Sequence, residues 1–357
     1  MSLAMSSFHR INGEESARMK SLMPINSISD DDARLIHALQ VQPRAPWSEL
    51  SRALSVTPTA LAQRYARLHA AGMVRATGHA TWINSSRNTA FAEIDLEPGS
   101  LARATAILTE LPMAMTLDAT TSGTCLIATI SAPDESSLAT VLLETLPSLP
   151  GVRDVRAHLI TSTLKSGERW NVRALDPEQA AQIRGPRLPR ARAARNLDPQ
   201  FSSSLMAKLG RDARTPAAVL ARDLGVSEQK IHDAVAVLLH GQQFRLRTDV
   251  INLWAGWPVH IWYFADVPPR QLSAVATALT THPEVRYVGT AAGPANLTFD
   301  VWLRNLDVLH ALEAKIDSLS RTGVMIRRQI VLRTAKRLGH LIDHEGRFTD
   351  RYVATPG

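Results

Sequence analysis

The chain has 357 residues, of which 45% are hydrophobic and 20% are charged; this composition is typical of a globular protein long enough for two or more domains. No stretch approaches the roughly 18 to 20 apolar residues of a membrane span, and the N-terminus lacks the apolar core of a signal peptide. We therefore expect no membrane contact and a cytoplasmic location. The single cysteine, Cys125, excludes an internal disulfide framework and a metal cage built from cysteines. The net charge of +7 fits a polyanionic partner such as nucleic acid, and equally a solvated basic surface.

The N-terminal region predicts a mobile tail followed by three short helices. Residues 1–27 show no sustained hydrophobic period and are expected to form the tail. Over 28–83, prolines separate the first helix from the second, and Thr57 and Pro58 are placed to cap and begin a third. The apolar positions of this third helix recur at i, i+4 and i+7, as Leu61, Tyr65 and Leu68. A tight turn before the third helix is typical of a helix-turn-helix domain.

The pattern then changes to that of an α+β domain. Over 88–165, four short apolar stretches indicate strands and two amphipathic stretches indicate helices. The strands are expected at 89–96, 113–120, 124–131 and 152–163, and the helices at 100–110 and 134–147. The order βαββαβ is typical of a ferredoxin-like α+β sandwich.

The second half of the sequence repeats this organisation. Residues 166–195 are expected to be a basic linker, because its last twelve residues hold five arginines, two prolines and no acidic residue. Leu54 and Leu224 are 170 residues apart, and Gly151 and Gly323 are 172 apart, which indicates an internal duplication. The remaining predicted parts are a second helical triplet over 196–250, a second βαββαβ domain over 256–335 and a tail over 336–357.

The stretch DDDARLIHALQVQPRAPWSELSRALSVTPTALAQRYARLHAAGMV, from Asp30 to Val74, resembles the DNA-binding domain of the Lrp/AsnC (feast/famine) family of bacterial and archaeal transcription regulators. The second copy, LARDLGVSEQKIHDAVAVL, has Gly225 where this family usually has glycine and the first copy has Ser55. The resemblance implies an α+β fold in which a winged helix-turn-helix and a ferredoxin-like βαββαβ ligand domain (RAM domain) occur twice. It also implies a sequence-specific DNA-binding regulator that responds to a small metabolite.

The third helix of the first copy carries the candidate DNA contacts. In a helix-turn-helix the second helix of the motif enters the major groove, where glutamine pairs with adenine and arginine with guanine or phosphate. The residues expected to contact double-stranded DNA are Ser48, Thr57, Thr59, Ala60, Gln63, Arg64 and Arg67. A charged helix face that is merely solvated is the alternative for the two arginines.

The second copy lacks this basic face. Its five aligned positions carry one lysine and one aspartate, for a charge of zero, whereas the first copy carries two arginines, for +2. These positions are Gln229, Lys230, Asp233, Ala234 and Val237. Because an aspartate facing phosphate is repelled, we expect weak DNA contact or none. Recognition of a two-fold symmetric site would then require two chains, so we expect a homo-oligomer in which each chain is a pseudo-dimer.

The turn that binds the effector in the family is altered in both copies. Its usual G-x-[YF]-D becomes GTCL at 123–126 and GPAN at 293–296, so the aspartate is lost in one copy and replaced by asparagine in the other. A small-molecule effector, such as an amino acid, is implied by the resemblance alone. The candidate contacts are Thr121, Ser122, Gly123, Thr124, Gly293 and Asn296; polar turns without a ligand are the alternative.

An enzyme of the same fold is the alternative function. Siroheme decarboxylases share this architecture, and His79, Arg87 and His260 are available for the acid side chains of a tetrapyrrole, although the GFxANxMvvW-like segment of those enzymes is absent. His340 and His344 have the spacing of two metal ligands on a helix but lack a third nearby. Since no catalytic or cofactor motif has diagnostic spacing, we expect no catalytic residue, metal or cofactor.

Overall fold

The computed structural model describes residues 28–81, 88–183, 185, 197–319 and 325–355. The predicted tail at 1–27 and nearly all of the basic stretch 184–195 lie outside these ranges. Within them, no helix has both the length and the apolar character that crossing a membrane requires.

The first helical domain comprises α2 (Asp30–Val41), α3 (Trp47–Leu54) and α4 (Pro58–Ala70), followed by β1 (Val74–Ala80). A capping box between Ser29 and Asp32 begins α2. The Thr57 hydroxyl accepts a hydrogen bond from the Ala60 amide at the start of α4. The predicted inward face of α4 is confirmed, because Leu61, Tyr65 and Leu68 are its buried residues.

The second helical domain has the same element order, with α8 (Pro199–Arg211), α9 (Ala217–Leu224), α10 (Glu228–His240) and β6 (Phe244–Val250). The turn before the third helix is left-handed in both domains, at Ser55 with φ 57° and at Gly225 with φ 65°. Only glycine adopts this conformation without steric cost, so the first domain holds Ser55 against its preference.

Both ligand domains have the βαββαβ order. The first consists of β2 (Thr89–Leu96), α5 (Leu101–Glu110), β3 (Ala114–Thr120), β4 (Cys125–Ser131), α6 (Glu135–Thr140) with a π-helical turn (Val141–Thr145), and β5 (Val152–Lys165). The second consists of β7 (Val259–Asp266), α11 (Pro269–Thr280), β8 (Val285–Ala292), β9 (Leu297–Leu303), α12 (Leu309–Ser318) and β10 (Met325–Arg337). The order within each sheet, β5-β2-β4-β3 and β10-β7-β9-β8, is the same.

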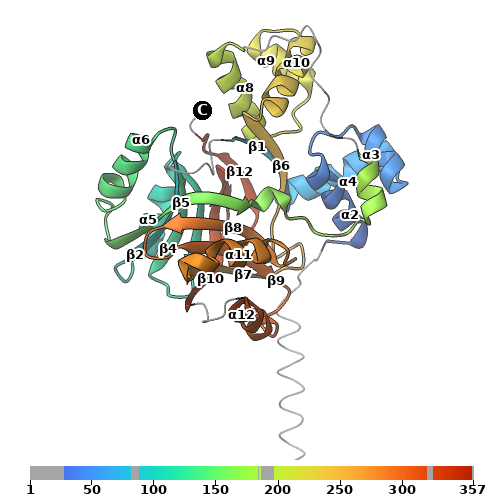
Figure 1. Ribbon diagram of the computed structural model, residues 1–357. Helices are drawn as coiled ribbons and strands as arrows, with labels where there is room; N and C mark the ends of the chain where they lie inside the picture. Colours follow the sequence, from blue (N-terminus) through green and yellow to red (C-terminus); the bar gives the residue numbers. More distant parts are fainter. Residues whose placement is uncertain (1–27, 82–87, 184, 186–196, 320–324, 356–357) are drawn as a thin grey trace, which may run out of the picture.

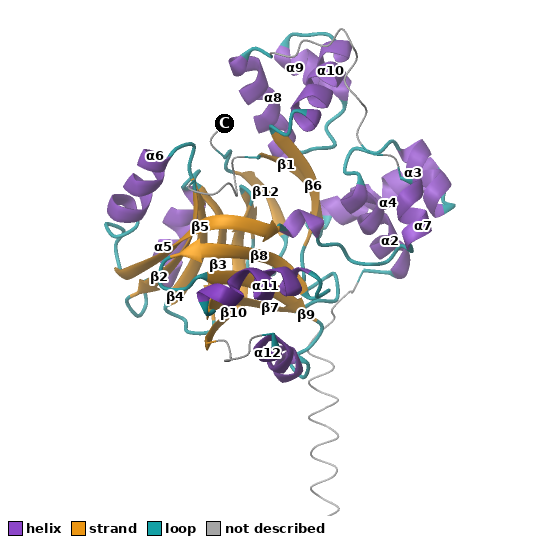
Figure 2. Ribbon diagram, in the orientation of Figure 1, coloured by secondary structure: helices purple, strands orange, loops and turns teal. Residues whose placement is uncertain are grey.

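The two sheets join into a closed barrel. β5 pairs with β2 along its first half and with β8 along its second, and β10 pairs in the same way with β7 and then with β3. The helices of the ligand domains lie outside the barrel, and the helical domains lie beyond one end of it, at the right and the top of the view (Figures 1 and 2). Alternating side chains of every strand therefore point into one shared interior.

The two helical domains contact each other through equivalent residues. β1 and β6 form an antiparallel ribbon centred on Thr77 and Arg247. Arg44 donates to the carbonyl oxygens of Ala213 and Thr215, and Arg214 donates to those of Pro43 and Ala45. Each arginine thus binds the turn that carries the other, which is the reciprocity of a two-fold contact.

Removing one of these arginines is expected to loosen the helical pair. Arg214→Ala leaves two carbonyl oxygens without their charged donor and removes a guanidinium that lies 3.8 Å above the centre of the Trp47 ring. We expect a loss of about 2 kcal/mol in the free energy of unfolding. Urea denaturation followed by tryptophan fluorescence measures it, and Arg222→Ala, an exposed arginine of the same domain, is the control with an expected change below about 0.5 kcal/mol.

Two predicted connecting segments are structured, and these expectations were wrong. The predicted linker 166–195 contains a 3₁₀ turn (Gly167–Arg169) and α7 (Pro177–Gln182), and its apolar side chains, including Trp170, are buried against the first helical domain. The predicted tail 336–357 contains the end of β10 and a hairpin of β11 (His340–Ile342) and β12 (Phe348–Tyr352). In both segments a few apolar residues pack on a core formed by other parts of the chain. Because these residues follow no regular spacing, sequence periodicity does not predict their structure.

Candidate functional site

The candidate reader surface is the solvent side of α4 together with the start of α3. Ser48, Thr57, Thr59, Gln63 and Arg67 are exposed, and Ala60 is half-buried. These side chains offer hydroxyl, amide and guanidinium groups along one helix face. Such groups can contact base edges and phosphates when the helix lies in a major groove.

The two arginines of α4 are bound to acidic residues of α2. Arg64 contacts Asp31 at 3.1 Å and Asp32 at 3.2 Å, and Arg67 contacts Asp32 at 2.6 Å. Burial acts to raise the pKa of Asp32, but hydrogen bonds from Arg67 and Ser29 outweigh it and lower the pKa. The Arg64 side chain is only 24% exposed, whereas that of Arg67 is 63% exposed. Arg64 therefore turns toward α2, and Arg67 is the more exposed of the two predicted DNA contacts.

The equivalent face of α10 is poorer in available groups. Ala234, expected to face outward, is fully buried, because this helix packs that position into its own core. Gln229 donates to Asp233 at 2.9 Å, and Lys230 lies 4.8 Å from the centre of the Phe201 ring. The two helices therefore differ in more than charge, because Gln229 and Lys230 of α10 contact neighbouring residues of their own domain.

The polar side chains of the predicted effector turns form hydrogen bonds within the protein. In the β3–β4 turn, Thr121, Ser122 and Gly123 are exposed and Thr124 is half-buried; the Ser122 hydroxyl bonds Thr120 and the Thr124 amide. In the β8–β9 turn, Asn296 both accepts from and donates to the backbone of Val267. A side chain on Gly293 would stand 2.6 Å from the Ala157 carbonyl oxygen. Gly293 and Asn296 therefore have structural roles here.

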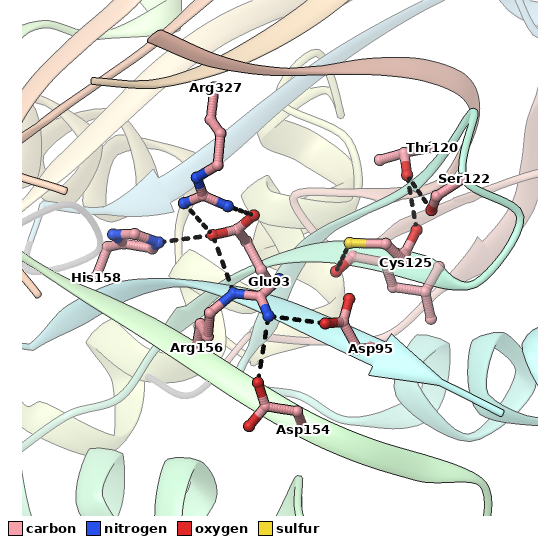
Figure 3. Close-up of polar contacts among 10 residues, drawn as sticks. Glu93, Asp95, Thr120, Ser122, Cys125, Asp154, Arg156, His158 and Arg327 are labelled. Atoms are coloured by element: carbon pink, nitrogen blue, oxygen red, sulfur yellow. Dashed lines mark hydrogen bonds and ion pairs between the residues drawn. The ribbon is translucent and has the colours of Figure 1, made fainter. Parts of the chain in front are cut away.

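An ionic cluster around the buried Glu93 and His158 joins the two ligand domains (Figure 3). Glu93 of β2 is completely buried and accepts from Arg327 of β10 at 2.7 and 2.8 Å. It also lies 2.9 Å from Nε2 of the buried His158 and 3.7 Å from Nε of Arg156, both on β5. Arg156 continues the network to Asp95 at 2.8 Å. This cluster holds β2, β5 and β10 together through charged hydrogen bonds.

A second buried cluster lies at the end of the barrel beneath β6. Arg286 contacts Asp300 at 3.2 Å, and Arg247 contacts Asp249. Burial lowers the pKa of Arg286 to about 10. Arg337 is also buried, and the guanidiniums of Arg286 and Arg337 lie 4.2 and 5.2 Å from the centre of the Trp302 ring. The cluster contacts both the barrel and the ribbon between the helical domains.

Two known family models match the first half of the chain. Residues 28–69 match the AsnC-type helix-turn-helix domain, and residues 89–170 match the Lrp/AsnC ligand-binding domain. The first unit belongs to the Lrp/AsnC family. An uncharacterised HTH-type transcriptional regulator of Pyrococcus abyssi is 26% identical over 144 residues, 39% of this chain and 90% of that protein. Another from Pyrococcus horikoshii is 24% identical over the same shares.

The fold of the whole chain also has counterparts. The crystal structure of the siroheme decarboxylase NirDL superposes with a TM-score of 0.57 and 10% identity, over 86% of this chain and 93% of that one. A second structure, NirDL in co-complex with an iron-uroporphyrin III analogue, gives a TM-score of 0.53 and 12% identity, over 83% and 88%. At this identity the likeness concerns the fold alone.

Sequence reasoning missed the charged residues inside the barrel, apart from His260. Glu93 stands alone in the otherwise apolar TAFAEIDL, and Asp300 stands alone in LTFDVWL. A single charge at the centre of a buried strand is the signal that could have found them, because such a group requires a partner.

The two ligand domains are expected to lose stability in acid through Glu93. Burial acts to raise its pKa, but hydrogen bonds from His158 and Arg327 lower it from 4.5 to about 2. A depressed carboxyl pKa stabilises the folded state above the unfolded value, and that contribution disappears as the pH falls from about 4.5 toward 2. Urea denaturation across this range should show a wild-type advantage over Glu93→Gln that shrinks by on the order of 3 kcal/mol. An advantage that stays constant with pH would contradict the assignment.

Proposed function

We propose that this protein is a sequence-specific DNA-binding transcription regulator in which α4 is the reading helix. The observation that carries the proposal is the exposed set Thr59, Gln63 and Arg67 on a helix whose domain matches the AsnC-type helix-turn-helix. Gln63 supplies a bidentate amide for a base edge, and Arg67 supplies a cation for phosphate or guanine. Arg64 holds α4 against α2 instead of reading DNA.

The chain functions as a covalent pseudo-dimer with one strong reader, the product of an internal duplication. Support comes from the shared element order, the matching strand exchanges of β5 and β10, and the reciprocal contacts of Arg44 and Arg214. The second reader, α10, makes weak DNA contact or none. Two-fold symmetric DNA would then engage two chains, each through its own α4.

Binding to the DNA upstream of its own coding sequence tests the proposal. Purified full-length protein is titrated into this fluorescent duplex at several salt concentrations, with an unrelated duplex of equal length as the control. Preferred binding that weakens linearly on a logarithmic salt scale is expected. Equal affinity for both duplexes would leave only non-specific attraction of a basic protein and would refute sequence-specific reading of this DNA.

A siroheme decarboxylase-like activity is the second candidate, favoured by the full-length likeness to NirDL and by the buried arginines near His260. Two of the three residues considered for a tetrapyrrole, His79 and His260, are buried, and Arg87 lies outside the described residues. The cavity beside His260 measures about 70 Å³, far below the roughly 300 Å³ or more of pockets for larger ligands. Titration with siroheme distinguishes the candidates: a shifted absorption spectrum with stoichiometric uptake supports the enzyme, and an unchanged spectrum removes it.

A further inference from the structure

The C-terminal hairpin of β11 and β12 is fixed to the barrel. β11 pairs with the end of β10, which is a strand of the barrel. Ile342 and Phe348 of the hairpin are buried in one apolar cluster with Ile251 and Trp254, which lie between β6 and β7. Figure 1 shows β12 at the end of the barrel, beside the ribbon of β1 and β6. The hairpin therefore lies where the barrel meets the helical domains.

The backbone of the hairpin is bonded to the turn that follows α4. The Phe348 amide donates to the carbonyl oxygen of Gly72 at 2.8 Å. Gly72 has a φ of +67°, and a Cβ at this position would stand 2.5 Å from the Phe348 carbonyl oxygen and 2.9 Å from Arg347 Cβ. The close approach of the hairpin to this turn therefore requires a residue without a side chain.

The side chain of Arg75 joins the hairpin to the last turn of α4. It is buried and donates to the carbonyl oxygen of His69, near the end of α4. It also donates to the carbonyl oxygens of Phe348 and Thr349 in β12, at 3.4 Å each, and lies 3.5 Å from the carboxylate of Asp350. A cation is favoured at the C-terminal end of a helix. Arg75 thus holds the end of α4 against β12.

The equivalent positions of the second helical domain, 170 residues further on, are bonded differently. Gln242 stands at the position of Gly72 and has the same left-handed backbone, with a φ of 51°. Arg245 stands at the position of Arg75, but it pairs with Glu168 in the 3₁₀ turn after β5. The Arg245 side chain is 45% exposed, whereas that of Arg75 is 5% exposed. Of the two equivalent turns, the one after α4 is therefore the one that the hairpin holds.

We infer that the C-terminal hairpin positions the reading helix and that Arg75 is its positioning residue: together they hold α4 in the orientation that reads DNA. A helix that is already in place loses less freedom when it binds, and specific base contacts depend on such preorganisation. Attraction to phosphates depends on charge and tolerates many orientations. The effect on DNA rests on the proposed function, whereas the placement of α4 against the barrel can be measured without DNA.

Gly72→Asn separates the hairpin from the turn after α4 without changing the charge of the chain. Asparagine adopts a left-handed backbone more readily than most residues, but its Cβ would occupy the space of the Phe348 carbonyl oxygen. Gln242→Asn, at the equivalent position of the second helical domain, is the matched control. Arg75→Gln removes the donors to β12 by a different route and decides the question if Gly72→Asn does not fold.

Electron–electron distance measurements between two spin labels on the full chain, without DNA, test the placement of α4. The labels are attached at Ala66→Cys on α4 and Ala106→Cys on α5, which are exposed positions, and the buried Cys125 is replaced by alanine. We expect one narrow distance distribution in the parent and in Gln242→Asn. In Gly72→Asn and Arg75→Gln we expect a distribution at least about twice as wide, because local contacts that hold the helix are lost. An unchanged width in the folded variants, or equal broadening in Gln242→Asn, would overturn the inference.

Titrations of the unlabelled variants with the upstream duplex and with the unrelated duplex test the effect on reading. Gly72→Asn is expected to lower the ratio of the two affinities about tenfold or more, and to leave the affinity for the unrelated duplex within about threefold, because the charge is unchanged. Loss of folding would instead lower both affinities. A broader distance distribution with an unchanged ratio would refute α4 as the reading helix, and thus the proposed function, while the hairpin would still hold α4. An unchanged distribution would refute the inference alone.

Discussion

Glu93→Ala is expected to lower the free energy of unfolding by about 2 to 3 kcal/mol, because the buried His158 loses its acceptor while the half-exposed Arg327 can be hydrated. The variant leaves the fully buried His158 and the bidentate donor Arg327 without their common acceptor. Since these residues belong to three strands and both ligand domains, we expect the loss to loosen the whole barrel. Chemical denaturation at neutral pH, followed by circular dichroism, measures the effect.

A matched control for Glu93 is Glu110, which pairs with Arg351 across the surface. Both side chains of that pair are more than half exposed, so Glu110→Ala is expected to change stability by less than about 1 kcal/mol. Similar losses in the two variants would mean that the buried cluster contributes no more than a surface ion pair, and would contradict its role in joining the domains.

Replacing Gln63 and Arg67 together by alanine is expected to weaken specific DNA binding by about 100-fold or more. A bidentate base contact contributes about 1 to 3 kcal/mol of discrimination, and loss of one phosphate contact reduces the salt slope by about one. The substitutions lie away from the buried Leu61, Tyr65 and Leu68 of α4. Asp32 loses Arg67 but keeps its contact with Arg64, so we expect the fold to be retained, which circular dichroism checks. Fluorescence anisotropy with the preferred duplex at several salt concentrations measures both quantities.

The control for the reading helix is an exposed polar pair on α10, at the positions aligned with Thr59 and Ala60. Gln229 is bound to Asp233, and Lys230 lies against Phe201, so Gln229→Ala with Lys230→Ala is expected to leave affinity within about threefold. This comparison keeps constant the number of substitutions and the helix of the motif in which they lie. A loss as large as that of the α4 variant would give both helices a reading role.

What the sequence predicts well is encoded locally. The start of α4 is specified by Thr57 and Pro58, and its inward face by Leu61, Tyr65 and Leu68, all within one helix. The order of strands and helices in the ligand domains likewise follows from short-range periodicity. These features need no knowledge of the rest of the chain.

The features that the sequence does not predict depend on distant contacts. Arg64 occupies an outward position on a helical wheel, yet Asp31 and Asp32 of another helix bind it. The pairing of β5 with β8 and of β10 with β3 closes the barrel between the two units. Only after that closure does the side chain of Glu93 have Arg327 as a neighbour. A pattern within one strand contains no information on such a partner.

The two helical domains also differ in packing at an aligned position of their third helices. Position 64 of the first helical domain is an arginine bound to α2, and position 234 of the second is an alanine buried in the core. The substitution removes a charge and also tightens the second domain around its own residues. The asymmetry predicted from net charge is thus accompanied by a difference in packing, which is consistent with separate roles for α4 and α10 in the proposed regulator.

Hydroxyl-radical footprinting tests the central claim, one reading helix per chain, most directly. The preferred upstream duplex is titrated with full-length protein from below to above saturation, and protection is recorded for each half-site. The account predicts that the first bound chain protects one major-groove segment, that a second segment appears only when a second chain binds, and that the α4 variant loses both. Simultaneous protection of two half-sites by a single chain, with one of them lost in the α10 variant, would contradict it.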